Sequence, residues 1–231
     1  MIIRDQFDPT LRDRISKKKY VAVIPIGSIE QHGPHLPIST DSDIVSEIAS
    51  RLCQKCDFLL LPTITYGVSF EHFPFFNLSI RKSSLALILE DLCSSLYDNH
   101  IDKVIILNGH HGNLDSLKKF EKRINKKLKK PKISIFSYWH YLEQDFDHAG
   151  FVETSLMLAI SNKVKMKKAK KGLITKNLNK KQISRINKVA LKSFPKATKN
   201  GIWGNPLRAT KQDGMKILTR IVRNLSKVCQ T

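Results

Sequence analysis

Short apolar runs alternate with longer amphipathic runs along this chain, and no other feature of the sequence constrains the fold as strongly. The short runs are rich in Val, Ile, Leu and Phe: YVAVIPI at 20–26, FLLLPTI at 58–64, KVIIL at 103–107 and ISIFSY at 133–138. Strands that are covered on both faces have this composition. Strands that alternate with helices predict stacked βαβ units around a mainly parallel sheet, an α/β fold.

Apolar residues at helical spacing lie between these runs. Three stripes predict helices that pack on the core: Ile44, Val45, Ile48 and Leu52; Leu85, Ile88, Leu89, Leu92 and Leu96; and Leu117, Phe120, Ile124 and Leu128. Further helices are expected over 153–160, 182–194 and 212–228, with the lysine-rich stretch before Gly172 as a surface connection. No internal repeat or linker interrupts the pattern, so the 231 residues are expected to form one domain over 1–231.

The glycines gather in polar segments. All except Gly172 lie in or beside five short stretches, at 27–35, 66–72, 108–113, 147–150 and 201–214. Glycine is needed where the backbone turns sharply or approaches a ligand closely. Three of the stretches directly follow a predicted strand, which is where open α/β sheets place their binding crevices. We therefore expect the functional residues in these segments.

The first segment crowds ionisable side chains between a buried strand and a helix. Glu30, His32, His35 and Asp41 fall within twelve residues, and buried charges are costly unless something pairs them. Glu30 and His32 are two residues apart and point to one side of an extended backbone. After the turn at 34–37, the chain can bring Asp41 back to the same point. Carboxylate and imidazole ligands suit zinc, manganese or iron. The alternative is that Glu30 and Asp41 only cap turns or helices.

Two further segments add candidates. His110 stands at the end of a predicted strand and is the fourth expected metal ligand, whereas the neighbouring His111 is expected to face substrate. Glu153 opens a predicted helix, where it can complete the shell of a second metal or only cap the helix. His148 can donate a proton to a leaving nitrogen.

The formal net charge of +20 raises the question of an anionic partner. Much of the charge lies at 118–132 and 163–171, where lysines flank regularly spaced apolar residues without interleaved aromatics. This pattern indicates a solvated lysine-rich face, and nucleic acid is not expected as a partner. No run is long enough to span a membrane, and the first residues lack the apolar stretch of a signal peptide, so a cytoplasmic protein is expected. The cysteines at 53, 56, 93 and 229 are expected to be free thiols.

Taken together, the motifs resemble the creatininase family, which includes archaeal formamidopyrimidine deformylases and mycofactocin-precursor peptidases. The family pattern G-S-x-E-Q-H-G-P-H-L-P-x-x-T-D is matched at 27–41, and N-G-H-G-G-N is matched at 108–113 except for His111. YG-x-S-x-EH appears at 66–72, HAG-x-x-ETS at 148–155 and G-x-x-G-x-P-x-x-AT at 201–210.

The resemblance implies a three-layer α/β sandwich, two divalent metal ions and a homo-oligomer, with a hexamer as one form. Carried over to this sequence, Glu30 and His110 would bind one metal, His32 the other, and Asp41 would bridge them. A metal-bound hydroxide would attack an amide carbonyl. Glu153 would be a further metal ligand and catalytic group, and His148 would be the proton donor. Contacts to substrate would come from Ser69, His72 and His111.

The leading hypothesis is a metal-dependent amidohydrolase that cleaves a non-peptide C–N bond in a small amide or formamide, with flavin or deazaflavin biosynthesis as a candidate pathway. The alternatives are a peptidase or cyclic-ketone hydrolase using the same two-metal site, and a nucleic-acid-binding protein with a structural metal. Two departures from the family, at 73–77 and at Phe151, are expected to shape the substrate pocket. Gly112 stands where a creatinine hydrolase is expected to carry glutamate, so creatinine itself is not the expected substrate.

Overall fold

Four parallel strands form the sheet of the computed structural model, which describes residues 1–127, 131–145 and 147–229. In the order β2-β1-β3-β4 they are Leu59–Leu60, Val21–Ile26, Lys103–Asn108 and Lys132–Ser137. The predicted α/β fold with a parallel sheet is thus confirmed. The run at 58–64 forms only two residues of regular strand, because after Leu61 the next hydrogen bond to β1 comes from Ile64, three residues on, and breaks the two-residue repeat of the ladder.

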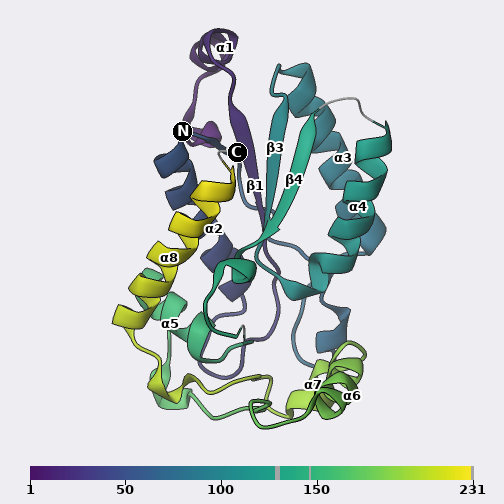
Figure 1. Cartoon of the computed structure of the whole chain (residues 1–231), viewed down its shortest axis with the longest axis vertical. Helices are drawn as coiled ribbons and strands as arrows, with labels where there is room; N and C mark the ends of the chain where they lie inside the picture. Colours follow the sequence, from purple (N-terminus) through teal and green to yellow (C-terminus); the bar gives the residue numbers. More distant parts are fainter. Residues whose placement is uncertain (128–130, 146, 230–231) are drawn as a thin grey trace.

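Helices cover both faces of the sheet, so the molecule has three layers (Figure 1). One face carries α2 (Thr40–Cys56), α5 (Phe151–Ile160) and α8 (Lys211–Cys229), and the other carries α3 (Lys82–Asp98) and α4 (Leu114–Lys127). The chain also begins with α1 (Asp8–Lys17), which the sequence did not predict because only Leu11 and Ile15 mark its apolar stripe. Short 3-10 turns complete the chain: Ile3–Asp5 (η1), Phe70–His72 (η2), His111–Asn113 (η3), Tyr138–Tyr141 (η4), Met166–Lys168 (η5) and Pro206–Arg208 (η6).

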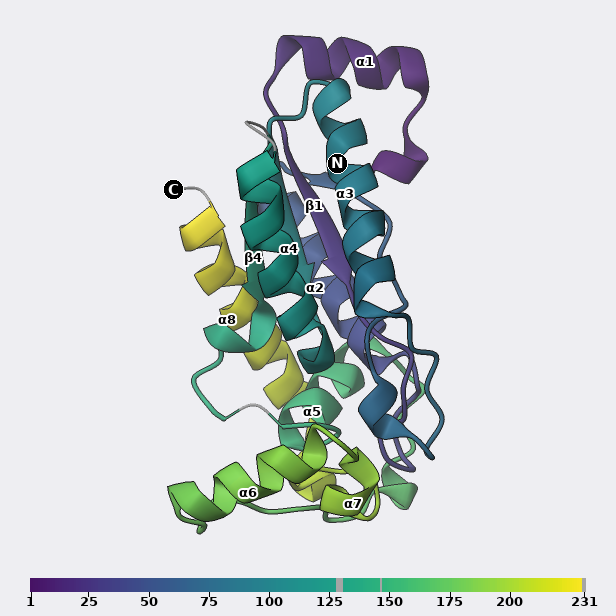
Figure 2. The same cartoon turned by 90° about the vertical axis from the view of Figure 1, so that its right-hand side faces the viewer.

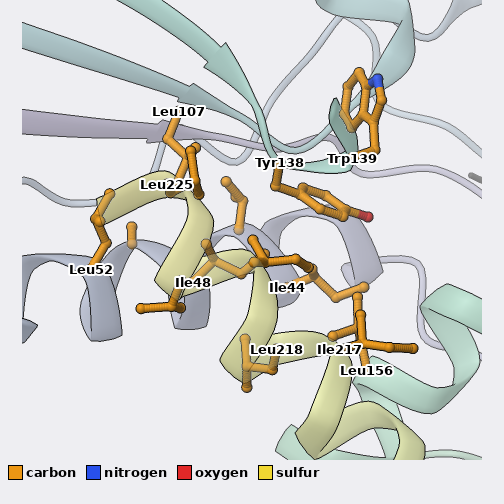
Figure 3. Packing of buried hydrophobic residues seen from close by; sticks show 14 of the residues in the cluster. Ile44, Ile48, Leu52, Leu107, Tyr138, Trp139, Leu156, Ile217, Leu218 and Leu225 are labelled. Atoms are coloured by element: carbon orange, nitrogen blue, oxygen red, sulfur yellow. The ribbon is translucent and has the colours of Figure 1, made fainter. Parts of the chain in front are cut away.

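The strands alternate their side chains between two apolar clusters. In β1, Ile24 and Ile26 pack on the α3 and α4 side, whereas Val23 packs on the side of α2, α5 and α8. Figure 3 shows the second cluster, where Ile48 of α2 lies near Leu218 of α8. Burying each such side chain contributes about 1.5–3 kcal/mol, so these contacts set the positions of the helices on the sheet.

The predicted helical stripes are confirmed on α2 and, over its described residues, on α4, whereas α3 differs at one position. Ile88 is 41% exposed, so placing it in the core was wrong; the buried face of α3 runs through Leu85, Leu89 and Cys93 instead. Leu128, the last member of the α4 stripe, lies outside the described residues.

The helix expected over 182–194 is two helices, α6 (Lys180–Ala190) and α7 (Phe194–Thr198). Pro195 lacks the N–H that a continuous helix would use but is tolerated in the first turn of a helix, so a new helix starts at Phe194, after the extended Ser193. Both helices lie beyond the carboxyl ends of the strands (Figure 2). They therefore stand on the side where α/β sheets place their binding sites.

Across the described part of the chain, none of the helices combines the length and the apolar character needed to cross a bilayer. The cysteines at 53, 56, 93 and 229 are free, as expected.

Candidate metal centre

The carboxyl ends of β1 and β3 bring the predicted segments together. The backbone N–H of Gly109 donates to the carbonyl of Ile26 at 2.8 Å. Asn113 joins a third segment, since its side-chain oxygen accepts from the N–H of Val68 at 2.9 Å and its amide donates to the carbonyl of Gly27 at 3.2 Å. Three stretches far apart in sequence are thereby held around one point.

Five buried side chains form two groups of three that share Asp41. Glu30, Asp41 and His110 form one group, and His32, Asp41 and Glu153 form the other; in each, the candidate ligand atoms lie within 4.8 Å of one another. Asp41 Oδ2 lies 3.0 Å from His110 Nδ1, and its Oδ1 lies 3.1 Å from His32 Nε2. One carboxylate therefore faces both groups.

Backbone carbonyls fix the orientation of the two histidines. The Nδ1–H of His32 donates to the carbonyl of Glu30 at 3.1 Å, and the Nε2–H of His110 donates to the carbonyl of Val68 at 2.9 Å. A carbonyl can only accept, so when each ring loses its second proton the lone pair is on the opposite nitrogen, Nε2 of His32 and Nδ1 of His110. Metal-binding histidines are commonly oriented in this way.

Glu153 faces the cluster from the first turn of α5. Its Oε2 accepts from the N–H of Ala149 at 2.6 Å and lies 3.6 Å from His32 Nε2. Asp147, which the sequence did not single out, accepts from the N–H of Val152 at 3.0 Å and from that of Glu153 at 3.4 Å. Because Asp147 satisfies these helix N–H groups, Glu153 is not needed to cap the helix, and its Oε1 is left without a hydrogen bond.

Buried carboxylate oxygens that make no hydrogen bond show that the residues fit a divalent metal. Both oxygens of Glu30, Oδ2 of Asp41 and Oε1 of Glu153 are buried without a hydrogen bond. Such groups are costly to bury unless a cation or a donor satisfies them. Carboxylate and imidazole donors in this number suit zinc, manganese or iron.

Proton affinities reflect the same crowding. Burial raises the pKa of Glu30 and of Glu153 to about 8. For His32 and His110, burial lowers the pKa, but the charges of Asp41 and Glu30 outweigh it and raise both values to about 10. In the metal-free protein these histidines therefore hold protons where a metal would otherwise bind.

A cavity of about 290 Å³ opens onto the cluster. Of the residues predicted from sequence, it is lined by Glu30, Asp41, His72, His110, His111 and His148. His32 and Glu153 do not line it, and Ser69 is fully buried elsewhere. Sequence reasoning missed the rest of the wall, which consists of Glu71, Gly112, Asp147, Asn187, Ala190, Leu191, Phe194 and Trp203.

An aromatic side chain covers two of the histidines. Phe194 stacks on His72 with ring centroids 4.7 Å apart and meets His148 edge-on at 4.7 Å. The side-chain amide of Gln31 donates to His72 Nδ1 at 3.0 Å, and His72 Nε2 faces Glu30 Oε1 at 3.1 Å. Burial and neighbouring histidine charges lower the pKa of His72 to about 3 and that of His148 well below its usual value. Both rings are neutral at pH 7.

Gly112 has no room for a side chain. A Cβ there would lie 2.2 Å from the carbonyl oxygen of Val68 and 2.4 Å from His110 Nε2. Glu71 Oε1 lies 2.8 Å from the same point, so the carboxylate on this wall comes from η2. Burial raises the pKa of Glu71. In the sequence it was a fixed position of the YG-x-S-x-EH motif to which no role had been given.

The departures expected to shape the pocket do not line it. Phe73 is 74% exposed and Phe76 is 57% exposed. Phe151 packs against the core from the start of α5. His35, the remaining ionisable residue of the first segment, pairs with Thr154 Oγ1 at 2.9 Å instead of joining the cluster.

Comparisons with known proteins show the family and the fold. A sequence model of the creatininase family, described as creatinine amidohydrolase, matches residues 7–229. The mycofactocin precursor peptide peptidase of Mycobacterium ulcerans is 28% identical over 218 residues, covering 87% of this chain and 80% of that protein. The 2-amino-5-formylamino-6-ribosylaminopyrimidin-4(3H)-one 5'-monophosphate deformylase of Methanothermus fervidus is 29% identical over 215 residues, covering 90% and 79%. A solved structure described as creatininase Mn has a TM-score of 0.81 at 18% identity, covering 98% of this chain and 96% of that chain, and shows the shared fold.

Proposed function

The chain belongs to the creatininase family, and from this membership and the buried carboxylate–histidine cluster we propose that the protein is a metal-dependent amidohydrolase. The observation that carries the proposal is the position of Asp41, whose two oxygens lie 3.0 Å from His110 and 3.1 Å from His32. A carboxylate placed in this way can bridge two cations. Glu30 and His110 would hold one ion, and His32 and Glu153 the other. Zinc, manganese and iron all suit these donors.

The bound ions would supply Lewis-acid activation of a water molecule and of the substrate carbonyl. The chain itself supplies orientation and proton transfer. Apolar walls at Leu191, Phe194 and Trp203 keep bulk water from the reacting groups. His148 lies on the cavity wall as a neutral imidazole, so it can take up a proton and pass it to the departing nitrogen.

The cavity favours a small substrate. Its volume of about 290 Å³ lies near the lower end of ligand pockets. The Methanothermus relative is named for removing a formyl group from a formylamino compound, which makes a small formamide our first candidate. The Mycobacterium relative is named as a peptidase, so the end of a short peptide is the second. Flavin or deazaflavin biosynthesis stays a prediction.

Turnover with and without metal tests the proposal. Protein that has been treated with a chelator is reloaded with zinc, manganese or iron and assayed against formanilides and cyclic amides. We expect hydrolysis that disappears with the metal and in the variant His32→Ala. Lys103→Ala, at the amino end of β3 and away from the cluster, serves as the control. Metal-loaded protein that hydrolyses no amide or formamide would count decisively against the proposal.

We also propose that the protein is a homo-oligomer, with a hexamer as the form that the family resemblance implies. Four apolar side chains between 70 and 78 support association, since each is 47% to 74% exposed: Phe70, Phe73, Phe76 and Leu78. Exposed apolar groups of this size are typical of interaction surfaces. Sedimentation velocity on the wild type and on Phe73→Ser would test it, and a wild type that sediments as a monomer would contradict it.

A further inference from the structure

Charge is distributed very unevenly along the chain. Residues 154–231 hold 20 of the 40 lysines and arginines but only one of the 20 acidic residues, Asp213. Residues 1–153 hold the other 20 basic and 19 acidic residues and are nearly balanced. The net charge of +20 therefore belongs almost entirely to the C-terminal third of the sequence.

The excess cations of this segment have few counter-ions in the fold. Among the residues that the structure describes, Arg220 is its one cation in an ion pair, with Glu143. Like charges at this density repel one another and destabilise a compact state. An external anion would relieve that repulsion.

The same segment builds the mouth of the cavity. Asn187, Ala190, Leu191, Phe194 and Trp203 line it, and all five belong to 154–231. Lys188 and Lys192 are exposed and adjoin Asn187 and Leu191 in the sequence. Leu191 lines the cavity and is 69% exposed, so it stands at the entrance, and both lysines lie within three residues of it in the sequence. In Figures 1 and 2, α6 and α7 stand past the carboxyl ends of the strands.

The floor of the cavity has the opposite character. The buried carboxylates of Glu30 and Asp41 lie there, and the half-buried Glu71 and Asp147 also line the cavity. Metal ions would neutralise these carboxylates only in part. An anionic group is therefore disfavoured at the floor and favoured at the entrance. There the apolar wall strengthens the positive electrostatic potential of the lysines.

From this polarity we propose that the substrate is a small molecule with an amide or formamide at one end and an anionic group, a phosphate or a carboxylate, at the other. The lysine-rich mouth formed by α6 and its neighbours binds the anionic end, while the uncharged end reaches the metal centre. The inference rests on the proposed hydrolase function and specifies its substrate class.

A small anion fits better than nucleic acid. The only aromatic residues of 154–231 are Phe194 and Trp203, and both line the cavity. Single-stranded nucleic acid is normally bound by aromatic side chains that stack on successive bases. The basic surface lacks such a platform.

Three formanilides that share one reacting group test the proposal: uncharged formanilide, 4-formamidobenzoate and 4-formamidophenyl phosphate. We expect kcat/KM to rise from the uncharged to the phosphorylated compound by at least about tenfold at low salt, and the advantage to shrink as salt is added. A preference for the phosphate alone would identify a phosphate site, whereas equal preference for both anions would indicate a general anion site.

Paired charge reversals locate the effect. Lys188→Glu with Lys192→Glu should remove most of the preference for the anions. Lys103→Glu with Lys132→Glu makes the same change of net charge at the amino ends of β3 and β4, where both lysines are exposed, and should preserve it. If both pairs act alike, net charge and not the mouth is responsible, and the inference fails.

Failure of the inference is distinct from failure of the proposed function. Equal turnover of all three compounds at every salt concentration overturns the inference and leaves the hydrolase intact. If no compound is hydrolysed, calorimetric binding of 4-aminophenyl phosphate still decides: binding that the Lys188 and Lys192 reversals abolish supports an anion site. Salt-sensitive binding of single-stranded RNA to the same lysines, without any preference among the three compounds, would replace it with a nucleic-acid surface.

Discussion

The absence of a side chain at Gly112 is a direct requirement of the His110 geometry. A methyl group there would meet the carbonyl oxygen of Val68 and His110 Nε2, the two atoms joined by the hydrogen bond that orients the ring. We expect Gly112→Ala to turn His110 away from Asp41 and to lower metal affinity and kcat/KM by about 10- to 100-fold. Elemental analysis and kinetics would measure both.

A second glycine variant is needed to separate the loss of the His110 geometry from steric strain in general. Gly172→Ala would place a methyl 2.1 Å from the carbonyl oxygen of Ile202, outside the cluster. It should lower stability but leave the metal content unchanged. A Gly112→Ala variant with full metal content and wild-type kinetics would refute the assigned role of the Val68 bond.

Asp147, which had no predicted role, accepts a hydrogen bond from the backbone N–H of Glu153, a candidate metal ligand, and so helps to position it. Asp147→Ala would free the N–H groups of Val152 and Glu153, so we expect a loss of about 0.5–2 kcal/mol in the free energy of unfolding. It should also weaken metal binding on the Glu153 side. Asp147→Asn keeps an acceptor oxygen and should retain most of both, as urea unfolding and metal titration would measure. If asparagine behaved like alanine, the charge and not the hydrogen bonding would matter.

The raised pKa values of His32 and His110 make metal uptake depend on pH. Both lie near 10 in the metal-free protein, so both histidines are protonated at pH 7 and must lose a proton before they bind a metal. Fewer protons are displaced as the pH rises towards 10, so affinity should increase with pH. Calorimetry in buffers of different ionisation enthalpy should show protons released on binding. Affinity that is constant between pH 6 and 9 would contradict these values.

At the scale of whole elements, the packing of α5 on α8 depends on a close approach at Gly214. A Cβ at this position would lie 1.8 Å from the carbonyl oxygen of Ser155. Gly214→Ala should therefore push the two helices apart and cost about 1–3 kcal/mol, as overpacked cores do. Urea denaturation would measure it, with Gln212→Ala as an exposed control on the same helix. Unchanged stability would contradict this prediction, because α5 and α8 would then move apart without any cost in the free energy of unfolding.

Much of the element structure could be predicted from local pattern. The stripes of α2 and α4 and the runs of β1 and β3 were visible because each buries one regular face. The first helix of the chain was missed because its stripe has two apolar residues. The break before α7 was missed because the apolar spacing of 182–194 continues across Ser193.

The candidate site divides in the same way. Glu30, Asp41 and His110 could be grouped from sequence because parallel strands end at one edge of a sheet. Phe194 and Trp203 could not, since they reach the cavity through the packing of α6, α7 and the loop after them, and local periodicity carries no information on that packing.

At the scale of the whole molecule, the end that carries the cavity lies far from the two ends of the chain. The start of the chain and the last turns of α8 lie at the opposite end from α6 and α7 (Figure 1). Tags at either end are therefore remote from the cavity mouth. The family match over 7–229 supports our proposal that 1–231 forms one domain, which limited proteolysis would test by yielding no stable smaller fragment.

Metal content tests the central claim most directly. Elemental analysis of protein purified without chelators should find about two divalent ions per chain. Asp41→Ala, checked by circular dichroism to be folded, should hold neither, whereas Asp43→Ala, which removes a carboxylate from the same turn of α2, should hold both. A wild type that is metal-free and takes up no added zinc, manganese or iron would contradict the account.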